Sequence, residues 1–174
     1  MTPPTWDLAF LFASLTDPGI DESWSQAHGK ADALQRFRGR FESGNADGGE
    51  LAEALAEVEQ VYLQASKPQE YASLVYAADA SRPEHGAFYQ EQAEKGTEVA
   101  VKLMFLELEL QGAPEEAVAR WSADPRMAPY LHYLKMVRVY APYRLSEKEE
   151  VLLEEVANTG PRAWGRLFDE TLSN

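Results

Sequence analysis

Histidine and glutamate side chains are the first candidates for chemistry in this sequence. The three histidines, His28, His85 and His132, are widely separated, and the two nearest are 47 residues apart. A zinc-peptidase helix needs two histidines one turn apart in the pattern H-E-x-x-H, and a bundle di-iron site needs Glu-x-x-His pairs. Neither pattern occurs. We therefore expect His28 on the flank of a helix, His85 at a helix start and His132 packed or solvated, with a site of dispersed histidines as the alternative.

Acidic pairs recur along the chain but do not by themselves form an acid–base site. They are Glu107/Glu109, Glu115/Glu116, Glu147/Glu149/Glu150 and Glu154/Glu155. Acid–base catalysis needs surroundings that separate the pKa values of two carboxyls inside a cleft. Glu107 and Glu109 interrupt an apolar run, so we expect one of them to be partly buried against an arginine or a tyrosine hydroxyl. An enzyme built on Glu107 and His132 is the corresponding catalytic alternative.

Two further segments suggest ligand binding only superficially. The stretch from Ser43 to Ala54 has acidic residues and glycine at spacings found in EF-hands, but its twelfth position is Ala54 instead of the glutamate that holds calcium. We interpret it as a turn followed by a helix N-terminus. The arginines in Arg36-Phe-Arg38-Gly-Arg40 could grip an anion, and the simpler interpretation is the cationic end of a helix.

Other chemistries are missing from the sequence. There is no nucleophile elbow, P-loop or G-x-G-x-x-G motif, and there is no cysteine for a disulfide or a thiolate site. We accordingly assign no catalytic, cofactor-binding or metal-ligating residue in this chain.

Charge and hydropathy restrict the partners. The net charge of −13 argues against nucleic acid and against an anionic membrane surface. Residues 1–7 lack the basic and apolar regions of a secretory signal, and the longest apolar run, 99–110, is too short to span a bilayer. We expect a soluble, cytoplasmic protein.

The composition predicts an all-α fold for these 174 residues, built as one domain. The chain has 25 Ala, 19 Leu and 21 Glu but only one Ile, ten Val and six Thr, which favours helix over strand. Apolar residues at helical spacing predict an array of about six to eight helices with short connections. The expected segments are 18–41, 50–81 with a kink or restart at Pro68, a central helix over 84–110, then 115–121, 124–140, 146–158 and 162–172.

Helix ends and buried faces follow from the same pattern. Asp17 with Pro18 favours a helix start, and Ser146 with Glu149 forms a capping box. Two sets of apolar residues are expected on the core side of the last two helices: Leu152, Leu153 and Val156, and then Trp164, Leu167 and Phe168.

Several strings in fixed order go beyond a generic helical pattern. They are Trp6-Asp7-Leu8 with Leu11, Phe12 and Asp17-Pro18-x-Ile20; Tyr71-Ala72-Ser73-Leu74 with Asp79; Phe105-Leu-Glu-Leu108-Glu109-Leu110; Trp121, Pro125 and Tyr130-x-His132-Tyr133-Leu134; Leu145-Ser-Glu-Lys-Glu149-Glu150; and Ala163-Trp164-x-x-Leu167-Phe168-Asp169-Glu170. Together they span nearly the whole chain. In this order the strings resemble the N-terminal region of the oligoendopeptidase F family, within the thimet-type M3 zinc metallopeptidases.

The resemblance implies a longer, mostly helical enzyme that hydrolyses short peptides in a deep channel. In that family zinc is held by the two histidines of H-E-x-x-H and a later glutamate, with the motif glutamate as general base. This chain has no such motif, so the zinc site is expected beyond Asn174 and no family catalytic residue can be assigned here. The implied role is that of a non-catalytic N-terminal domain that helps wall the channel, with the remaining catalytic domain as its partner.

On this view Trp164, Leu167 and Phe168 form an apolar patch against which the rest of the enzyme packs. The alternative is a stand-alone helical module that binds a peptide or a partner helix in an apolar groove.

Overall fold

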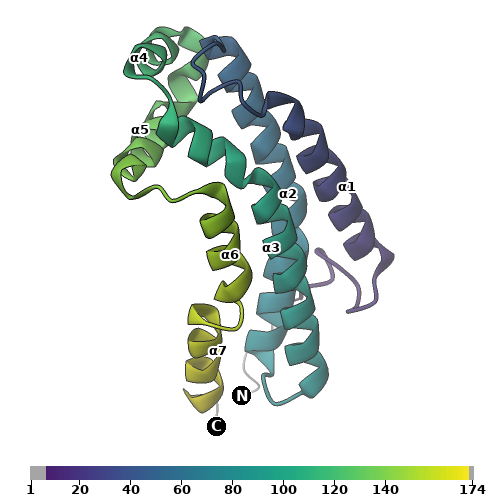
Figure 1. The fold of residues 1–174 in the computed structure, drawn as a ribbon. Helices are drawn as coiled ribbons and strands as arrows, with labels where there is room; N and C mark the ends of the chain where they lie inside the picture. The colour runs from purple at the N-terminus through teal and green to yellow at the C-terminus, as the bar shows by residue number, and fades with distance from the viewer. Residues whose placement is uncertain (1–6, 173–174) are drawn as a thin grey trace.

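The computed structural model describes residues 7–172 and confirms the all-α class. Over these residues it contains seven α-helices, three short 3-10 segments and no strand (Figure 1). The elements are α1 (Pro18–Leu34), η1 (Gln35–Phe37), α2 (Gly48–Ala78), α3 (Pro83–Gly112), α4 (Glu115–Ala123), η2 (Pro125–Tyr130), α5 (Leu131–Val139), η3 (Ala141–Tyr143), α6 (Glu147–Ala157) and α7 (Pro161–Leu172). Residues 1–6 lie outside the described residues. They include the motif residue Trp6 and most of the segment interpreted as lacking a secretory signal.

Helices α1, α2 and α3 pack side by side and enclose most of the core (Figure 1). Small residues of α1, including Ala27 and Ala31, are fully buried and allow close approach to α2. The indole Nε1 of Trp24 donates to Oε1 of Gln92 at 2.7 Å, which satisfies both polar groups inside the core. The expectation that the third helix is central is confirmed, because α3 also contacts α5 and α6.

Helix α1 ends earlier than its apolar spacing predicts. The stripe from Trp24 to Phe41 suggests one continuous helix, but α1 ends at Leu34, and Phe37 and Phe41 enter the core from a 3-10 turn and a loop. Gly39 has φ = +79°, a left-handed conformation that glycine adopts without strain, and it turns the chain out of the helical path. Periodicity alone does not distinguish this turn from a further helical turn.

Helix α2 is one element of 31 residues that runs through Pro68. The Asp47 side chain accepts the N–H of Glu50 at 2.8 Å and caps its start. The interpretation of 43–54 as a turn followed by a helix N-terminus is therefore confirmed.

The segment after α3 folds over one end of the three long helices (Figure 1). Trp121 of α4 is fully buried, and its Nε1 donates to the carbonyl of Ala46 at 2.9 Å. The helix expected from Asp124 begins instead as the 3-10 segment η2 and becomes α-helical only at Leu131.

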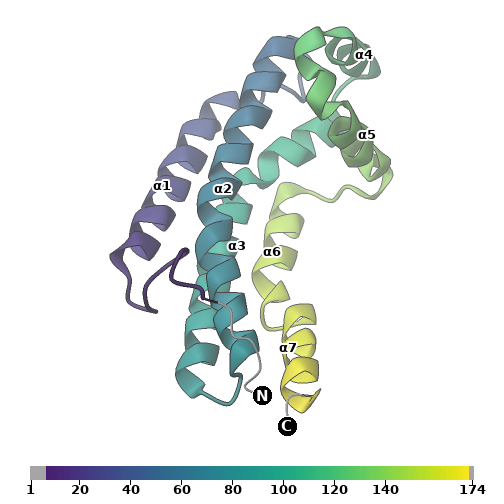
Figure 2. The same ribbon diagram turned by 180° about the vertical axis from the view of Figure 1, so that it is seen from behind.

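Helices α6 and α7 form an arm that runs back along the bundle on the side of α3 away from α1 (Figures 1 and 2). The capping box of Ser146 and Glu149 is present. Helix α6 packs on α3, whereas α7 contacts α6. Within 147–168 no side chain is fully buried, so the arm adds little to the core.

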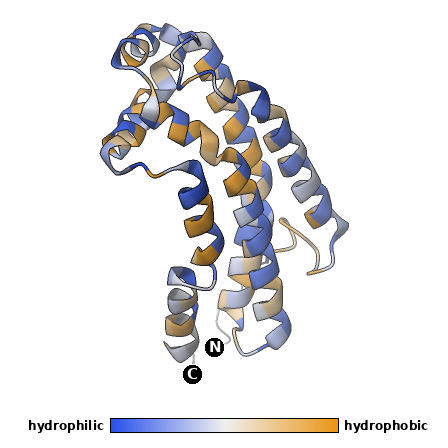
Figure 3. Ribbon diagram, in the orientation of Figure 1, coloured by the Kyte–Doolittle hydropathy of each residue, from blue (hydrophilic) through white to orange (hydrophobic). Residues whose placement is uncertain are grey.

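The expectation that α6 and α7 bury their large apolar side chains in the core is wrong. Six large apolar side chains are exposed instead: Leu152, Leu153, Val156, Trp164, Leu167 and Phe168. Apolar segments of α6 and α7 are visible in Figure 3. The sequence specifies an amphipathic helix, but it does not specify which part of the protein covers the apolar face. In the structure, α6 packs on α3 with its opposite face.

Candidate functional site

A trough runs along α3, bounded by α2 and α5 on one side and by α6 on the other. It consists of three cavities of about 420, 320 and 400 Å³, and neighbouring cavities share lining residues. The first two share Tyr62, Ala100, Glu154 and Arg162, and the second and third share Glu107 and Tyr133. Figure 2 shows the molecule from the side on which α2 lies in front of α3, with α6 beside them.

The arm is held over the trough by polar contacts. Arg162 at the start of α7 pairs with the Glu154 carboxylate at 2.7 Å and donates to Asn158 at 3.0 Å. Asn158 in turn donates to the Thr97 hydroxyl of α3 at 2.9 Å. The side of the arm facing the trough is therefore polar, which leaves the apolar side facing outward.

Two tyrosines and two glutamates give the middle of the trough its electrostatic character. The Tyr133 hydroxyl donates to Glu107 Oε1 at 3.0 Å, and burial together with this carboxylate raises the pKa of Tyr133 far above its ordinary value. Burial, and then the charges of Glu107 and Glu154, raise the pKa of Tyr62. Both phenols therefore stay protonated at neutral pH. Glu154 is paired with Arg162, whereas Glu107 accepts the Tyr133 hydroxyl.

The histidines do not meet at the trough. His28 on α1 lies 3.6 Å from Glu98, and Nδ1 of His85 lies 2.9 Å from the carbonyl of Asp79. His132 is exposed on α5 and is not among the residues that line the three cavities. Among the described side chains, those of residues 7–168 and 171–172, no group of three histidine, aspartate or glutamate residues is arranged to hold a metal ion.

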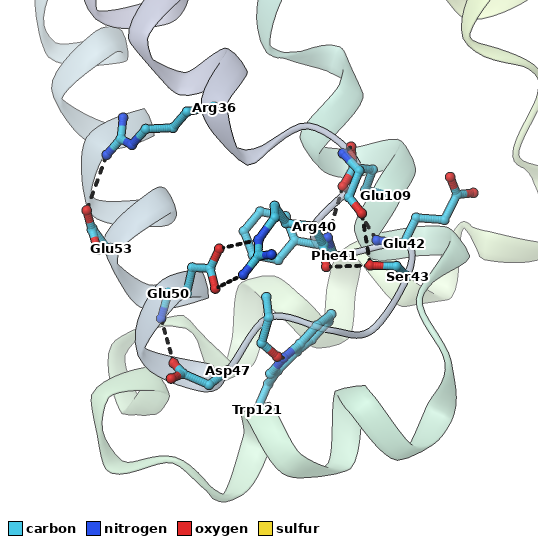
Figure 4. A network of polar contacts seen from close by, with 12 residues as sticks. Arg36, Arg40, Phe41, Glu42, Ser43, Asp47, Glu50, Glu53, Glu109 and Trp121 are labelled. Carbon is cyan, nitrogen blue, oxygen red and sulfur yellow. Dashed lines mark hydrogen bonds and ion pairs between the residues drawn. The ribbon is translucent and has the colours of Figure 1, made fainter.

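The Glu107/Glu109 pair divides as expected into one exposed and one buried residue. Glu109 is 6% exposed, but its partners are the backbone N–H groups of Gly39, Phe41 and Glu42 instead of an arginine or tyrosine (Figure 4). Glu107 takes the tyrosine partner. The buried carboxylate thus fixes the loop after η1 and is not available for chemistry.

The three arginines of the cluster form ion pairs with carboxylates of the same chain. Arg36 binds Glu53 and Glu57 of α2, and Arg40 binds both oxygens of Glu50 (Figure 4). Arg38 binds Glu147 at the start of α6 at 2.7 Å. The interpretation as a helix end is confirmed for Arg36, which lies in η1 directly after α1 and donates to the carbonyl of Ala33 at 3.0 Å. Arg38 and Arg40 lie in the loop beyond η1, and the three arginines together tie this segment to α2 and to the arm.

The residues that line the trough were missed by sequence reasoning or assigned to other roles. Tyr62 belongs to the apolar stripe of α2, yet it is half exposed and shared by two of the cavities. Glu154 falls in an acidic pair of the kind that marks a solvated helix face. Only the phase of α6 relative to α3, which depends on tertiary contacts, brings Glu154 towards Tyr62.

None of the helices that the structure describes is long and apolar enough to cross a membrane.

The molecule is thus an all-α protein with a trough along α3 and an arm whose apolar side faces outward. Residues 109–174 match the family model described as Oligopeptidase F, which represents the N-terminal region of M3 peptidases. The match covers more than a third of the chain, from the end of α3 through α7, and it confirms there the resemblance predicted from the motifs. The strings before residue 109 lie outside this match, where the resemblance stays a prediction. No curated protein and no solved structure shows significant similarity to the chain.

Proposed function

We propose that residues 1–174 are one helical domain, the non-catalytic N-terminal domain of an oligoendopeptidase F-like zinc metallopeptidase in the cytoplasm. In this proposal the domain helps wall the channel in which the enzyme hydrolyses short peptides. Its partner is the catalytic part of the same polypeptide. Zinc belongs to that part, because this chain has no H-E-x-x-H motif and its histidines lie on separate elements.

The observation that carries the proposal is the outward apolar side of the arm. Trp164 is 72% exposed and Phe168 63% exposed, and both lie inside the matched stretch. Arg162, on the same helix, binds Glu154 on the side facing the trough. A helix that turns its polar face to its own bundle and its apolar stripe to solvent has the character of an interface element.

The proposal is tested first on the coding DNA. An open frame that continues past the Asn174 codon and encodes H-E-x-x-H is the expected result. That downstream segment, expressed separately, should form a complex with this chain, with a blue shift of tryptophan emission as Trp164 becomes covered. Phe168→Glu should abolish the complex, whereas Lys148→Glu, on the exposed start of α6, serves as the control for a charge change away from α7.

Metal analysis supplies the second arm of the test. The 174-residue chain alone should bind no stoichiometric zinc and show no peptide cleavage that EDTA inhibits. Stoichiometric zinc binding or EDTA-sensitive peptide cleavage by this chain would overturn the assignment of catalysis to another part of the enzyme.

A stand-alone peptide-binding module is the second candidate, and the trough favours it. The cavities extend along α3 from Gln92 to Gln111, or roughly 28 Å at 1.5 Å per residue, which suits about eight residues of extended peptide. A stop codon directly after Asn174, with saturable binding of basic peptides below millimolar concentration, would favour this candidate over the first.

A further inference from the structure

The cavity at the α5 end of the trough has an unusual lining of hydrogen-bond acceptors and aromatic rings. It measures about 400 Å³ and lies between the end of α3, α5, η3 and the start of α6. Its acceptors are Glu107, Gln111 and Glu150, and its rings are Tyr133, Tyr140 and Tyr143. We call it the acceptor cleft.

The acceptors of this cleft lack cationic partners. Oε1 of Gln111 is buried and has no hydrogen-bond partner within the described part of the chain. Among the described residues, Glu107 accepts the Tyr133 hydroxyl and pairs with no cation, and Glu150 accepts the N–H of Leu145 at 3.3 Å. An orphaned buried oxygen is costly, because it has lost water without gaining a donor. That oxygen is closed off from solvent, so the acceptors that a ligand can reach are the carboxylates of Glu107 and Glu150, and they favour a ligand that brings several donors.

The rings favour the same kind of ligand. Tyr140 is 58% exposed and Tyr143 76% exposed, and both line the cleft, so a ligand can reach their rings. The face of a tyrosine ring attracts a cation within about 6 Å of its centroid, and a planar cation also stacks on it. Rings beside carboxylates form a site for positive charge.

One cation of the protein itself lines the cleft, and its charge is already balanced. The guanidinium of Arg144 binds Glu42 Oε1 at 2.6 Å and does not pair with Glu107 or Glu150. The two carboxylates of the cleft therefore keep their negative charge for a ligand. The net charge of −13 further raises the local concentration of cations.

We propose that the acceptor cleft binds the guanidinium group of an arginine side chain carried by a peptide. A guanidinium offers five donors in a plane and a flat face, which suits two carboxylates beside tyrosine rings. An ammonium offers three donors and cannot stack. This inference stands on the residues of the cleft and holds whether the chain acts within a longer enzyme or alone.

The test is calorimetric titration of the full 174-residue chain with three matched peptides. The probe is acetyl-Ala-Ala-Arg-Ala-Ala-amide, and the comparison peptides carry citrulline or lysine at the centre. Citrulline keeps the shape of arginine but has no charge. We expect saturable binding of the arginine peptide, with the citrulline peptide at least about tenfold weaker because charge-assisted hydrogen bonds are lost. The affinity of the lysine peptide should lie between those of the arginine and citrulline peptides.

Variants locate the binding. Glu150→Gln and Tyr143→Ala should each weaken the arginine peptide by about tenfold. The matched control is Glu116→Gln, which removes an exposed carboxylate on α4 outside the cleft and should leave the affinity unchanged. Circular dichroism checks that each variant is folded; Tyr143 is so exposed that its removal leaves the core intact.

Four results would overturn the proposal. They are no saturable binding, equal affinity for arginine and citrulline peptides, equal affinity for arginine and lysine peptides, and an arginine affinity that Glu150→Gln leaves unchanged. None of these outcomes depends on zinc or on a catalytic domain, so the proposed function stands or falls separately.

Discussion

The carboxylate of Glu109 in α3 accepts the backbone N–H of Phe41 at 3.0 Å, although the two residues are 68 positions apart in the sequence. The same carboxylate also accepts the N–H groups of Gly39 and Glu42. A loop whose N–H groups point into the protein would otherwise bury unsatisfied donors. Glu109 thus closes the end of α1 against α3 and positions the arginines that bind α2 and the arm.

Replacing Glu109 should therefore cost much more stability than replacing its neighbour in the acidic pair. We expect Glu109→Ala to lower the free energy of unfolding by about 3 kcal/mol, because several buried N–H groups lose their acceptor. Glu107→Ala, on the exposed side of the same helix, should change it by less than about 1 kcal/mol. Urea unfolding followed by circular dichroism measures both. Equal losses in the two variants would contradict the structural role of Glu109.

The stability of the protein should fall in acid partly through Asp124. Hydrogen bonds from the Arg126 side chain and then from its backbone N–H lower the pKa of Asp124 from 3.8 to about 2. A carboxyl whose pKa is lower in the folded state stabilises that state above pH 4 and loses this contribution as the pH falls towards 2. Asp124→Asn should therefore flatten the decline of the urea midpoint between pH 4 and pH 2.

Asp21→Asn supplies the control for the acid experiment, because the Asp21 side chain is 86% exposed and lies 3.6 Å from its lysine partner. The urea midpoint of Asp21→Asn should decline between pH 4 and pH 2 as much as that of the unmodified protein. If the urea midpoint of Asp124→Asn declines as steeply as that of Asp21→Asn, the ion pair between Asp124 and Arg126 does not form in solution.

Two glycines should respond to alanine in opposite directions. A Cβ on Gly48, at the start of α2, would lie 2.4 Å from the Cβ of Asp124. Gly48→Ala should therefore lower the free energy of unfolding by about 2 kcal/mol through overpacking. Gly29, inside α1, has no atom near that position, so Gly29→Ala should raise it by about 1 kcal/mol. Thermal unfolding of the pair gives the comparison, and destabilisation by both substitutions would refute it.

The arm should open more often than the bundle. Amide hydrogens of α6 are expected to exchange faster than those of α2 between Leu51 and Ala65, because α6 buries no side chain whereas that part of α2 lies in the core. Asn158→Ala, which removes the hydrogen bond to Thr97, should accelerate exchange in α6 and leave α2 unchanged. Hydrogen exchange measured by mass spectrometry resolves the two segments. Equal protection of α6 and α2 would show that the arm is an integral part of the bundle.

Local chemistry in the sequence determined the class of fold and many helix starts. Abundant Ala, Leu and Glu with few β-branched residues specify helices, and the side chains of Asp17 and Asp47 and the capping box of Ser146 act within a few residues of their own positions. The burial of one member of the Glu107/Glu109 pair also followed from the apolar run around it. The ordered motifs indicated the family over the stretch that the comparison matches.

Tertiary structure alone decided the features on which function depends. The end of α1 at Leu34, the partners of Glu109 and the outward side of α6 and α7 each depend on contacts between residues far apart in the sequence. Helical periodicity places Trp164 and Phe168 on one face but carries no information about which body that face meets. The trough exists for the same reason, because its walls come from separate helices, α2, α3, α5, α6 and α7, whose relative rotation is fixed by packing and long-range hydrogen bonds.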